Sequence, residues 1–361
     1  MKNRMADTQK NIPIYLRKRE WLLAVMVFLI GLVLGGCSSK HSFVEEGMAA
    51  VEALDYETAL QHFEKALLEK EDLRLVYRGM GLAYMGLIQY EAAAECLEKA
   101  LASGNGRPDR MDYDINYYLA TVYYKLGQYE KSIQTYDAII ALKPKEKLAY
   151  YLRGSVWIYS DFEKAKADFD KAVSLGKEDY NQLIEIYQVL QTHGYKEAGI
   201  EYLQTALAGQ AKSLTDYQRG RISYYLEDYE NARAYLEKAK NAGDYETILL
   251  LGQTCEALGD YNYAINVYTT FIEKDQSNPQ VYNRLGLCRM EQGDYQSALS
   301  AFQTGIAIEN NDLMQTLKFN EIVTYERLGE FQKAAGLMES YLQMYPDDET
   351  AQREYVFLKT R

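Results

Sequence analysis

The sequence has little proline, little histidine and no recognisable catalytic motif, and each shortage narrows what the chain can be. Five prolines in 361 residues, with Ala, Leu, Glu, Lys and Gln prominent, indicate helices rather than a sheet. His41, His62 and His193 are not at ligand spacing from one another or from a cysteine, so no metal site is expected. Without a nucleotide-binding or hydrolase motif, we expect no cofactor, no small-molecule substrate and no enzymatic activity.

The charge balance excludes a further class of protein. The formal net charge is −12, and the basic first 36 residues leave about −16 for the remainder. Such a surface repels phosphate backbones, whose binding depends on Lys and Arg, so we expect no nucleic-acid partner. Cys96, Cys255 and Cys288 have no metal-binding spacing and are expected to be small buried apolar residues.

The first part of the chain has the pattern of an export signal. Several Lys and Arg residues within the first 20 positions precede an uncharged apolar run, Trp21–Gly36. As a helix this run covers about 24 Å, short of the roughly 30 Å hydrocarbon core but suited to a signal peptide. Residues 1–36 are therefore expected to be a signal peptide that takes no part in the fold.

The apolar run ends in Leu34-Gly-Gly-Cys37, which resembles the lipobox of bacterial lipoproteins. The resemblance implies that the mature chain begins at Cys37 with lipid on its sulfur, exported and anchored to the extracytoplasmic face of the cell membrane. Stable anchoring takes two membrane signals, such as two acyl chains. Residues 37–43 would then be a short lipidated tether. The alternative is an uncleaved signal anchor in which Cys37 is incidental.

The rest of the chain repeats itself at intervals close to 34 residues. Asp55–Leu67 is echoed by Gln89–Leu101, and both segments end in an apolar residue followed by Glu-Lys-Ala-Leu. An aromatic residue marks the same point of nine units. These markers are Tyr56, Tyr90, Tyr129, Phe162, Tyr195, Tyr229, Tyr261, Tyr295 and Phe331.

Each marker begins an amphipathic helical pattern, and another helical pattern precedes it. Glycines such as Gly47 and Gly252 recur in the preceding pattern, where glycine costs about 1 kcal/mol relative to alanine. We therefore expect the second helix to approach closely there through small residues such as Ala59 and Ala298. Glycines two residues before several markers, such as Gly259, predict a left-handed turn between the two helices.

This pattern resembles the tetratricopeptide repeat family. The eighth unit carries much of the family's signature as Tyr282, Leu285, Gly286, Gly293, Tyr295, Ala298 and Phe302. The resemblance implies an all-α fold, a right-handed superhelical solenoid of about nine helical hairpins over residues 44–348, closed by a C-terminal capping helix at 349–361. The units around Phe162 and Tyr195 depart most, because the first is one residue short and the second has His193 at the expected turn glycine.

Tyrosine is abundant, with 34 residues, and many of them fall on one face of the first helices. In the family this face lines a concave groove that holds extended peptides or helices of partners. Tyr and Arg are enriched at binding hot spots, so these residues are candidate partner contacts. They are Tyr117, Tyr118, Tyr124, Tyr151, Tyr187, Tyr217, Arg221, Tyr224 and Tyr225. The alternative is that many of these tyrosines cover neighbouring hairpins.

The sequence therefore predicts a protein that binds other proteins. The leading hypothesis is a membrane-anchored scaffold at the bacterial cell envelope that recruits protein partners through its groove. One alternative is an envelope protein that binds a polymer or glycan on its tyrosine faces. Another is an accessory subunit of an envelope complex, which differs from the scaffold only in the partner's identity.

Overall fold

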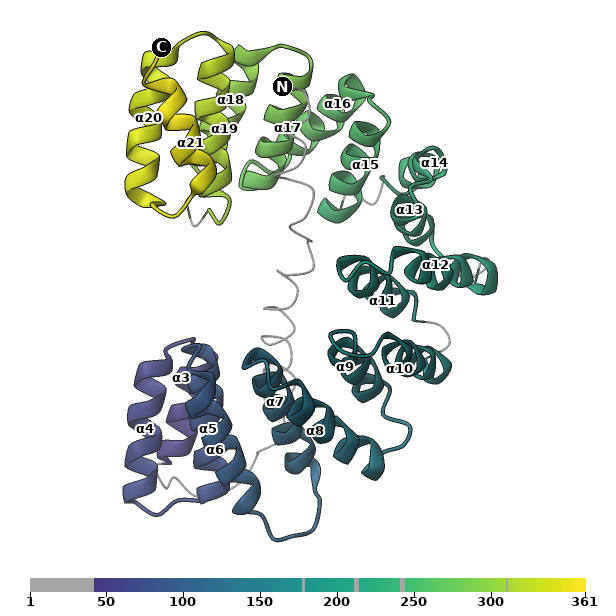
Figure 1. The fold of residues 1–361 in the computed structure, drawn as a ribbon, viewed down its shortest axis with the longest axis vertical. Coiled ribbons are helices and arrows are strands. Elements are labelled where there is room, and N and C mark those ends of the chain that lie inside the picture. The colour runs from purple at the N-terminus through teal and green to yellow at the C-terminus, as the bar shows by residue number, and fades with distance from the viewer. Residues whose placement is uncertain (1–41, 177–178, 211–213, 241–243, 310) are drawn as a thin grey trace. The chain divides into compact units, whose positions relative to one another are not determined.

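The computed structural model describes residues 42–176, 179–210, 214–240, 244–309 and 311–361 (Figure 1). Over these residues the chain forms nineteen helices and no strand, which confirms the all-α fold. None of the described helices has both the length and the apolar character needed to span a membrane. The expected signal peptide and Cys37 lie outside the described residues.

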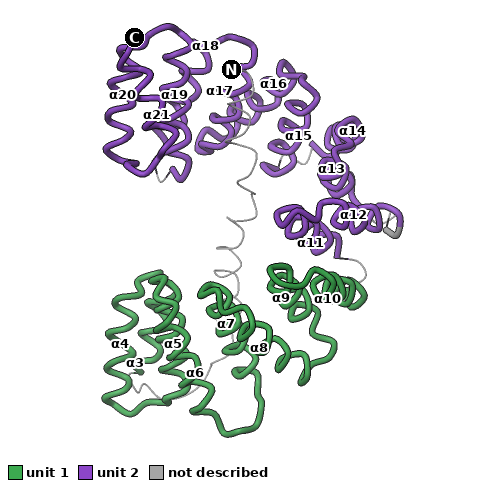
Figure 2. The backbone as a smooth tube through the Cα atoms, in the orientation of Figure 1, with its two compact units in different colours: residues 1–176 green, residues 177–361 purple. Residues whose placement is uncertain are grey.

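The helices fall into two compact units, residues 1–176 and 177–361 (Figure 2). Consecutive helices pack as hairpins within each unit, as predicted. Unit 1 contains α3 (Phe43–Glu52), α4 (Tyr56–Leu68), α5 (Leu73–Gly86), α6 (Tyr90–Ala102), α7 (Arg110–Lys125), α8 (Tyr129–Leu142), α9 (Lys147–Trp157) and α10 (Phe162–Leu175). Unit 2 contains α11 (Tyr180–Thr192), α12 (Lys196–Gln210), α13 (Asp216–Tyr225), α14 (Tyr229–Ala239), α15 (Tyr245–Ala257), α16 (Tyr261–Ile272), α17 (Pro279–Glu291), α18 (Tyr295–Ile306), α19 (Met314–Arg327), α20 (Phe331–Met344) and α21 (Glu349–Leu358).

The marker aromatics begin the second helix of their hairpins, as the repeat pattern predicts. Eight of the nine are the first residue of a helix, and only Tyr195 stands one residue before its helix, α12. An aspartate directly before several markers caps the helix: the Asp55 carboxylate, for example, accepts a hydrogen bond from the backbone N–H of Thr58. The starts of the second helices could therefore be predicted to within one residue.

The glycines of the first helices make room for a large side chain from the second helix. This refines the prediction that both helices carry small residues where they cross. A Cβ at Gly47 would lie 2.6 Å from the Phe63 ring, so any larger residue would clash. The predicted small partner Ala59 is fully buried beside this contact. The close approach thus needs a small residue on both helices and a large apolar residue on the next turn of the second helix.

The turns between paired helices use the left-handed backbone conformation, mostly at glycine. Gly259 has φ 75° and Gly293 has φ 77°, and a Cβ at either position would meet nothing within 4 Å. The first two hairpins place Leu54 and Ile88 there instead, each with φ 62°. The fourth hairpin has no such residue in its turn at 158–161, and its marker Phe162 follows the packing glycine Gly154 one residue sooner than in the other hairpins, as the sequence indicated.

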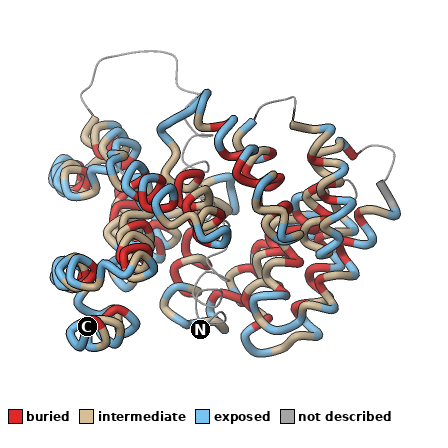
Figure 3. The backbone as a smooth tube through the Cα atoms, turned by 90° about the horizontal axis from the view of Figure 1, so that it is seen from above, coloured by how far each residue is buried: buried red, intermediate tan, exposed pale blue. Residues whose placement is uncertain are grey.

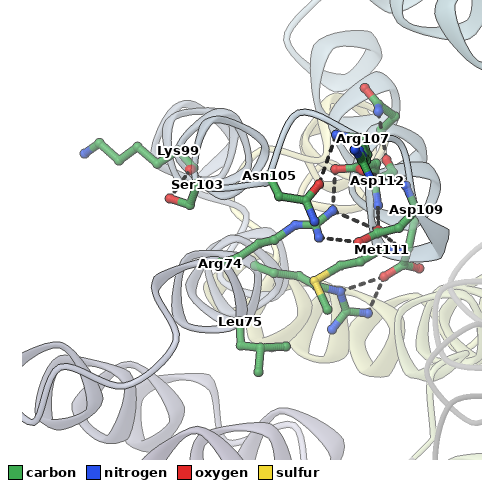
Figure 4. A network of polar contacts seen from close by, with 12 residues as sticks. Arg74, Leu75, Lys99, Ser103, Asn105, Arg107, Asp109, Met111 and Asp112 are labelled. Atoms are coloured by element: carbon green, nitrogen blue, oxygen red, sulfur yellow. Dashed lines mark hydrogen bonds and ion pairs between the residues drawn. The ribbon is translucent and has the colours of Figure 1, made fainter.

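The segment Ser103–Arg110, between the second and third hairpins, is held at its end by charge pairs (Figure 4). Arg74 of α5 donates two hydrogen bonds to the Asp109 carboxylate, at 2.6 and 2.9 Å, and also pairs with Asp112 of α7. Asp109 and Asp112 cap the start of α7 reciprocally. The Arg74 guanidinium lowers the pKa of Asp109 to about 2. The loop therefore ends in a fixed joint between α5 and α7.

Buried residues follow the inner sides of the helices within each unit (Figure 3). The cysteines of the described residues are free and buried, as predicted. At the C-terminal end, α21 buries Ala351 and Leu358 against the last hairpin and exposes Arg353. This arrangement is the one expected of a capping helix.

Candidate functional site

The candidate contacts lie on first helices of the hairpins, namely α7, α9, α11 and α13. Neighbouring first helices contact one another: α3 contacts α5 and α5 contacts α7 in unit 1, while α11 contacts α13 and α13 contacts α15 in unit 2. We call the surface made by these helices the first-helix face of each unit. Two shallow hollows lie elsewhere, at Lys143–Glu146 and around Pro346, and contain none of the candidates.

In unit 1, Tyr118 is buried and Tyr117 is half-buried. Tyr118 is only 2% exposed, with the Arg78 guanidinium 5.7 Å from its ring centre. Tyr117 is half-buried and its ring lies 6.2 Å from that of Tyr136 on α8. Burial raises the pKa of Tyr118 to about 12 and also raises the pKa of Tyr117. Tyr118 therefore contributes packing rather than an accessible contact.

Tyr124 belongs to a partly exposed tyrosine cluster that joins the third and fourth hairpins. Its hydroxyl lies 2.7 Å from the hydroxyl of Tyr159, and its ring lies 5.7 Å from the Tyr159 ring. Tyr129 stacks on Tyr159 at 4.7 Å. With Tyr159 43% exposed, this cluster presents aromatic surface to the solvent.

Tyr151 occupies the position in α9 that Tyr117 occupies in α7, but it is buried. Its side chain is 6% exposed and its ring lies 6.1 Å from Phe169 of α10. Nearby, Arg153 of α9 holds the buried Asp168 carboxylate through bonds of 2.6 and 2.7 Å. Tyr151 is therefore part of the packing between α9 and α10.

Tyr187 is also buried, at 1% exposed, because the fifth hairpin is shifted by one residue from the predicted register. The left-handed turn residue is Gly194 rather than the residue at 193, and α12 begins at Lys196 rather than at Tyr195. Counted from Lys196, Tyr187 falls where other hairpins have their packing glycine. The same shift moves Asn181 and Gln188 onto the first-helix face, and the sequence analysis missed both residues.

The remaining four candidates lie together on α13 in unit 2, and α11 supplies polar partners to two of them. Arg221 donates to the Asn181 side-chain oxygen at 2.9 Å, and the Gln188 amide donates to the Tyr225 hydroxyl at 2.7 Å. Tyr217 reaches in the other direction and donates to Glu246 of α15 at 3.3 Å. Three consecutive first helices are thus linked by polar side chains.

Tyr224 is half-buried like the other three candidates and connects α13 with the helices that follow. Its ring packs against the cluster of buried residues around α15 and α16 and meets Tyr225 and Tyr229 edge to face, each at 5.7 Å. Burial raises the pKa of Tyr224 to about 12. All four candidates on α13 are half-buried, and Tyr217, Arg221 and Tyr225 are the three that share polar side-chain contacts with α11 or α15.

Arg221 differs from Arg78 and Arg284 of the first-helix face in having no carboxylate partner among the described residues. Arg78 donates to Asp114 at 2.6 Å, and Arg284 donates to Glu256 at 3.1 Å. The hydrogen bond from Arg221 to the neutral Asn181 side chain leaves its positive charge uncompensated by an ion pair. A half-buried guanidinium in this state favours contact with a negatively charged group.

Comparison with known proteins identifies the repeat. Residues 78–147 and 249–312 match one description of the tetratricopeptide repeat, and residues 217–242 match a second. The chain therefore contains tetratricopeptide repeats, in the segments where the structure has its helical hairpins.

Curated relatives share the repeat over much of this chain. A TPR repeat-containing protein of Methanocaldococcus jannaschii is 25% identical over 65% of this chain and 43% of its own length. The Hsp70-Hsp90 organizing protein of Triticum aestivum is 24% identical over 74% of this chain and 41% of its own length. The chain thus spans less than half the length of these two relatives.

Solved structures of other repeat proteins resemble parts of the chain. A tetratricopeptide repeat protein from Parabacteroides merdae covers 70% of this chain and 98% of its own, with 13% identity and a TM-score of 0.47. YrrB, described as a TPR protein with an unusual peptide-binding site, covers 47% of this chain and 86% of its own, with 20% identity and a TM-score of 0.38.

Proposed function

We propose that this protein is a scaffold that binds an extended segment or a helix of a partner protein on the first-helix face of unit 2. The observation that carries the proposal is the grouping of Tyr217, Arg221 and Tyr225 on α13, half-buried and braced by Asn181 and Gln188 of α11. Tyrosine and arginine held by neighbours give contact area with little loss of side-chain entropy, which is what binding hot spots require.

The proposal includes attachment to the membrane. The lipobox-like Leu34-Gly-Gly-Cys37 follows an apolar run suited to a signal peptide, and a lipid on Cys37 would hold the repeats at the extracytoplasmic face of the cell envelope. In that location the scaffold would collect exported or membrane-bound partners. The name of the wheat relative, an organizing protein for Hsp70 and Hsp90, fits a role in holding other proteins.

Photo-crosslinking in intact cells tests the partner site. A photoreactive phenylalanine analogue in place of Tyr217 or Tyr225 should give discrete adducts with one or a few proteins. The control is the same analogue in place of Tyr195, which is 37% exposed at the turn between α11 and α12 and should give none of these adducts. Adducts of equal strength at Tyr195 or none at α13 would place the partner elsewhere.

Labelling with a radioactive fatty acid tests the anchor separately. The wild-type chain should incorporate label and sediment with membranes, whereas Cys37→Ser should be exported without label, because the thiol alone can carry the lipid. Equal label in the two proteins would contradict the lipid anchor and leave the uncleaved signal anchor as the explanation.

A further inference from the structure

The turn between α4 and α5 exposes two leucine side chains to the solvent. Leu68 is 81% exposed and Leu73 is 47% exposed, although both stand beside fully buried neighbours such as Ala66 and Val76. Between them, Lys70 is exposed and takes the left-handed conformation, with φ 57°. A single exposed leucine is ordinary on a protein surface, but two on one turn form a small apolar patch.

Two of the three acidic residues of this turn, Glu71 and Asp72, accept hydrogen bonds at helix N-termini, whereas the third, Glu69, is exposed. Glu71 accepts hydrogen bonds from the Ser42 hydroxyl at 2.9 Å and from the backbone N–H groups of Phe43 and Val44 at 2.8 and 3.1 Å. Asp72 accepts from two backbone N–H groups at the start of α5. Both carboxylates are therefore engaged at helix N-termini, where the helix dipole offsets their charge.

The same contacts place the turn beside the start of the folded chain. Since Glu71 binds Ser42, Phe43 and Val44, the chain enters α3 at this turn. Only five peptide units separate Ser42 from Cys37, which allows at most about 18 Å of extended chain. A lipid on Cys37 would hold the leucines within reach of the bilayer surface.

We propose that Leu68 and Leu73 insert into the membrane surface and orient the first hairpin on it; this inference rests on the proposed lipid anchor. Leucines enter the boundary between headgroups and acyl chains, and Lys70 reaches the phosphates with its ammonium group. Because the anchor keeps the turn close to the bilayer, a contact too weak to bind free protein forms readily as an intramolecular step. The first-helix face of unit 1 thereby takes a defined orientation to the membrane.

Fluorescence quenching in vesicles tests the contact. Full-length lipidated protein carrying Leu68→Cys or Leu73→Cys is labelled with a fluorophore and reconstituted into vesicles of phosphatidylethanolamine and phosphatidylglycerol with brominated acyl chains. The matched control is Leu142→Cys, because Leu142 is 54% exposed at the end of α8, in the corresponding turn of the third hairpin. Bromolipid should quench the labels at 68 and 73 at least twofold more than the label at 142.

The outcomes separate the inference from the anchor. Equal quenching at the three positions, in protein that carries labelled fatty acid and sediments with vesicles, would overturn the inference while leaving the anchor intact. Absence of fatty acid would instead contradict the anchor. A disulfide-linked dimer of the Leu68→Cys protein, formed equally with and without vesicles, would show that a second copy covers the turn and would also overturn the inference. Leu68→Asn with Leu73→Asn should leave lipidation and the melting temperature unchanged.

Discussion

Tyr187 packs directly against Gly199, and this pair reverses the arrangement found in most of the other hairpins. A Cβ at Gly199 would lie 3.0 Å from the Tyr187 ring and 3.2 Å from its backbone. In six other hairpins the glycine is on the first helix and the large residue on the second, as in Gly286 and Phe302. Exchanging large and small between the helices preserves the packed volume, so the hairpin forms with a different sequence pattern.

The first prediction concerns this pair. Gly199→Ala should destabilise unit 2 by about 1–3 kcal/mol, because the Tyr187 backbone cannot yield as a side chain would. The matched control is Gly336→Ala in α20, where a Cβ meets nothing within 4 Å and alanine should add up to about 1 kcal/mol through helix propensity. Urea denaturation of the two variants measures their free energies of unfolding. Equal effects at the two positions would contradict the packing argument.

The second prediction compares two arginines of the first-helix face. Arg284→Met should destabilise the protein by about 1–3 kcal/mol, because Glu256 loses its ion-pair partner in a half-buried site. Arg221→Met should change stability by less than about 1 kcal/mol, because no carboxylate of the described residues pairs with Arg221 and methionine retains the apolar contact.

Thermal melting and crosslinking distinguish the two arginine variants. If Arg221 contacts a partner, Arg221→Met should weaken the adducts at Tyr217 at nearly wild-type melting temperature. A large fall in melting temperature for Arg221→Met would show that this guanidinium serves the fold.

Most of the fold could be predicted from the sequence because packing in a repeat protein is local. Residues such as Tyr56 and Phe63 meet their partners within their own hairpin or the next one along the chain, so their spacing recurs and specifies the helix starts. The prediction was wrong in the fifth hairpin, where the shift at Gly194 and the exchange between Tyr187 and Gly199 conceal the register.

The candidate site was harder to predict because exposure depends on how closely the next element packs. Tyr151 and Tyr117 occupy equivalent positions, yet Tyr151 is buried against Phe169 whereas Tyr117 is only half-buried. The contact between Arg74 and Asp109 joins residues 35 positions apart and has no counterpart in the repeat pattern. Contacts of this kind require the three-dimensional structure.

The third prediction concerns the left-handed turns. Ile88→Gly should stabilise the second hairpin by roughly 0.5–1 kcal/mol. A branched residue at positive φ costs about 1–2 kcal/mol, and part of the stability gained is lost again because glycine has a higher conformational entropy in the unfolded chain. Little packing is lost because Ile88 is 71% exposed. The reverse change in the next hairpin, Gly127→Ile, should destabilise it. Denaturation midpoints that move in the same direction for both variants would contradict the backbone-strain argument.

The fourth prediction is a pH dependence at the capping helix. Glu326 of α19 is half-buried near Glu354 of α21, and its buried Oε1 atom has no hydrogen-bond partner among the described residues. Burial, with a further contribution from the charge of Glu354, raises the pKa of Glu326 to about 7. In the unfolded chain a glutamate titrates near about 4.3, so between these values the folded protein binds more protons than the unfolded one.

Stability should therefore fall as the pH rises from about 4.3 to 7, and stay lower above that window. Glu326→Gln removes the ionisable group. The free energy of unfolding of the variant should therefore rise relative to that of the wild type across the same window, by on the order of 1–2 kcal/mol at pH 8. Glu349→Gln, at an exposed position in the first turn of α21, is the control and should show no such gain. Melting temperatures measured from pH 5 to 8 test this prediction. A constant difference in melting temperature between Glu326→Gln and the wild type would show that Glu326 stays ionised in the folded protein.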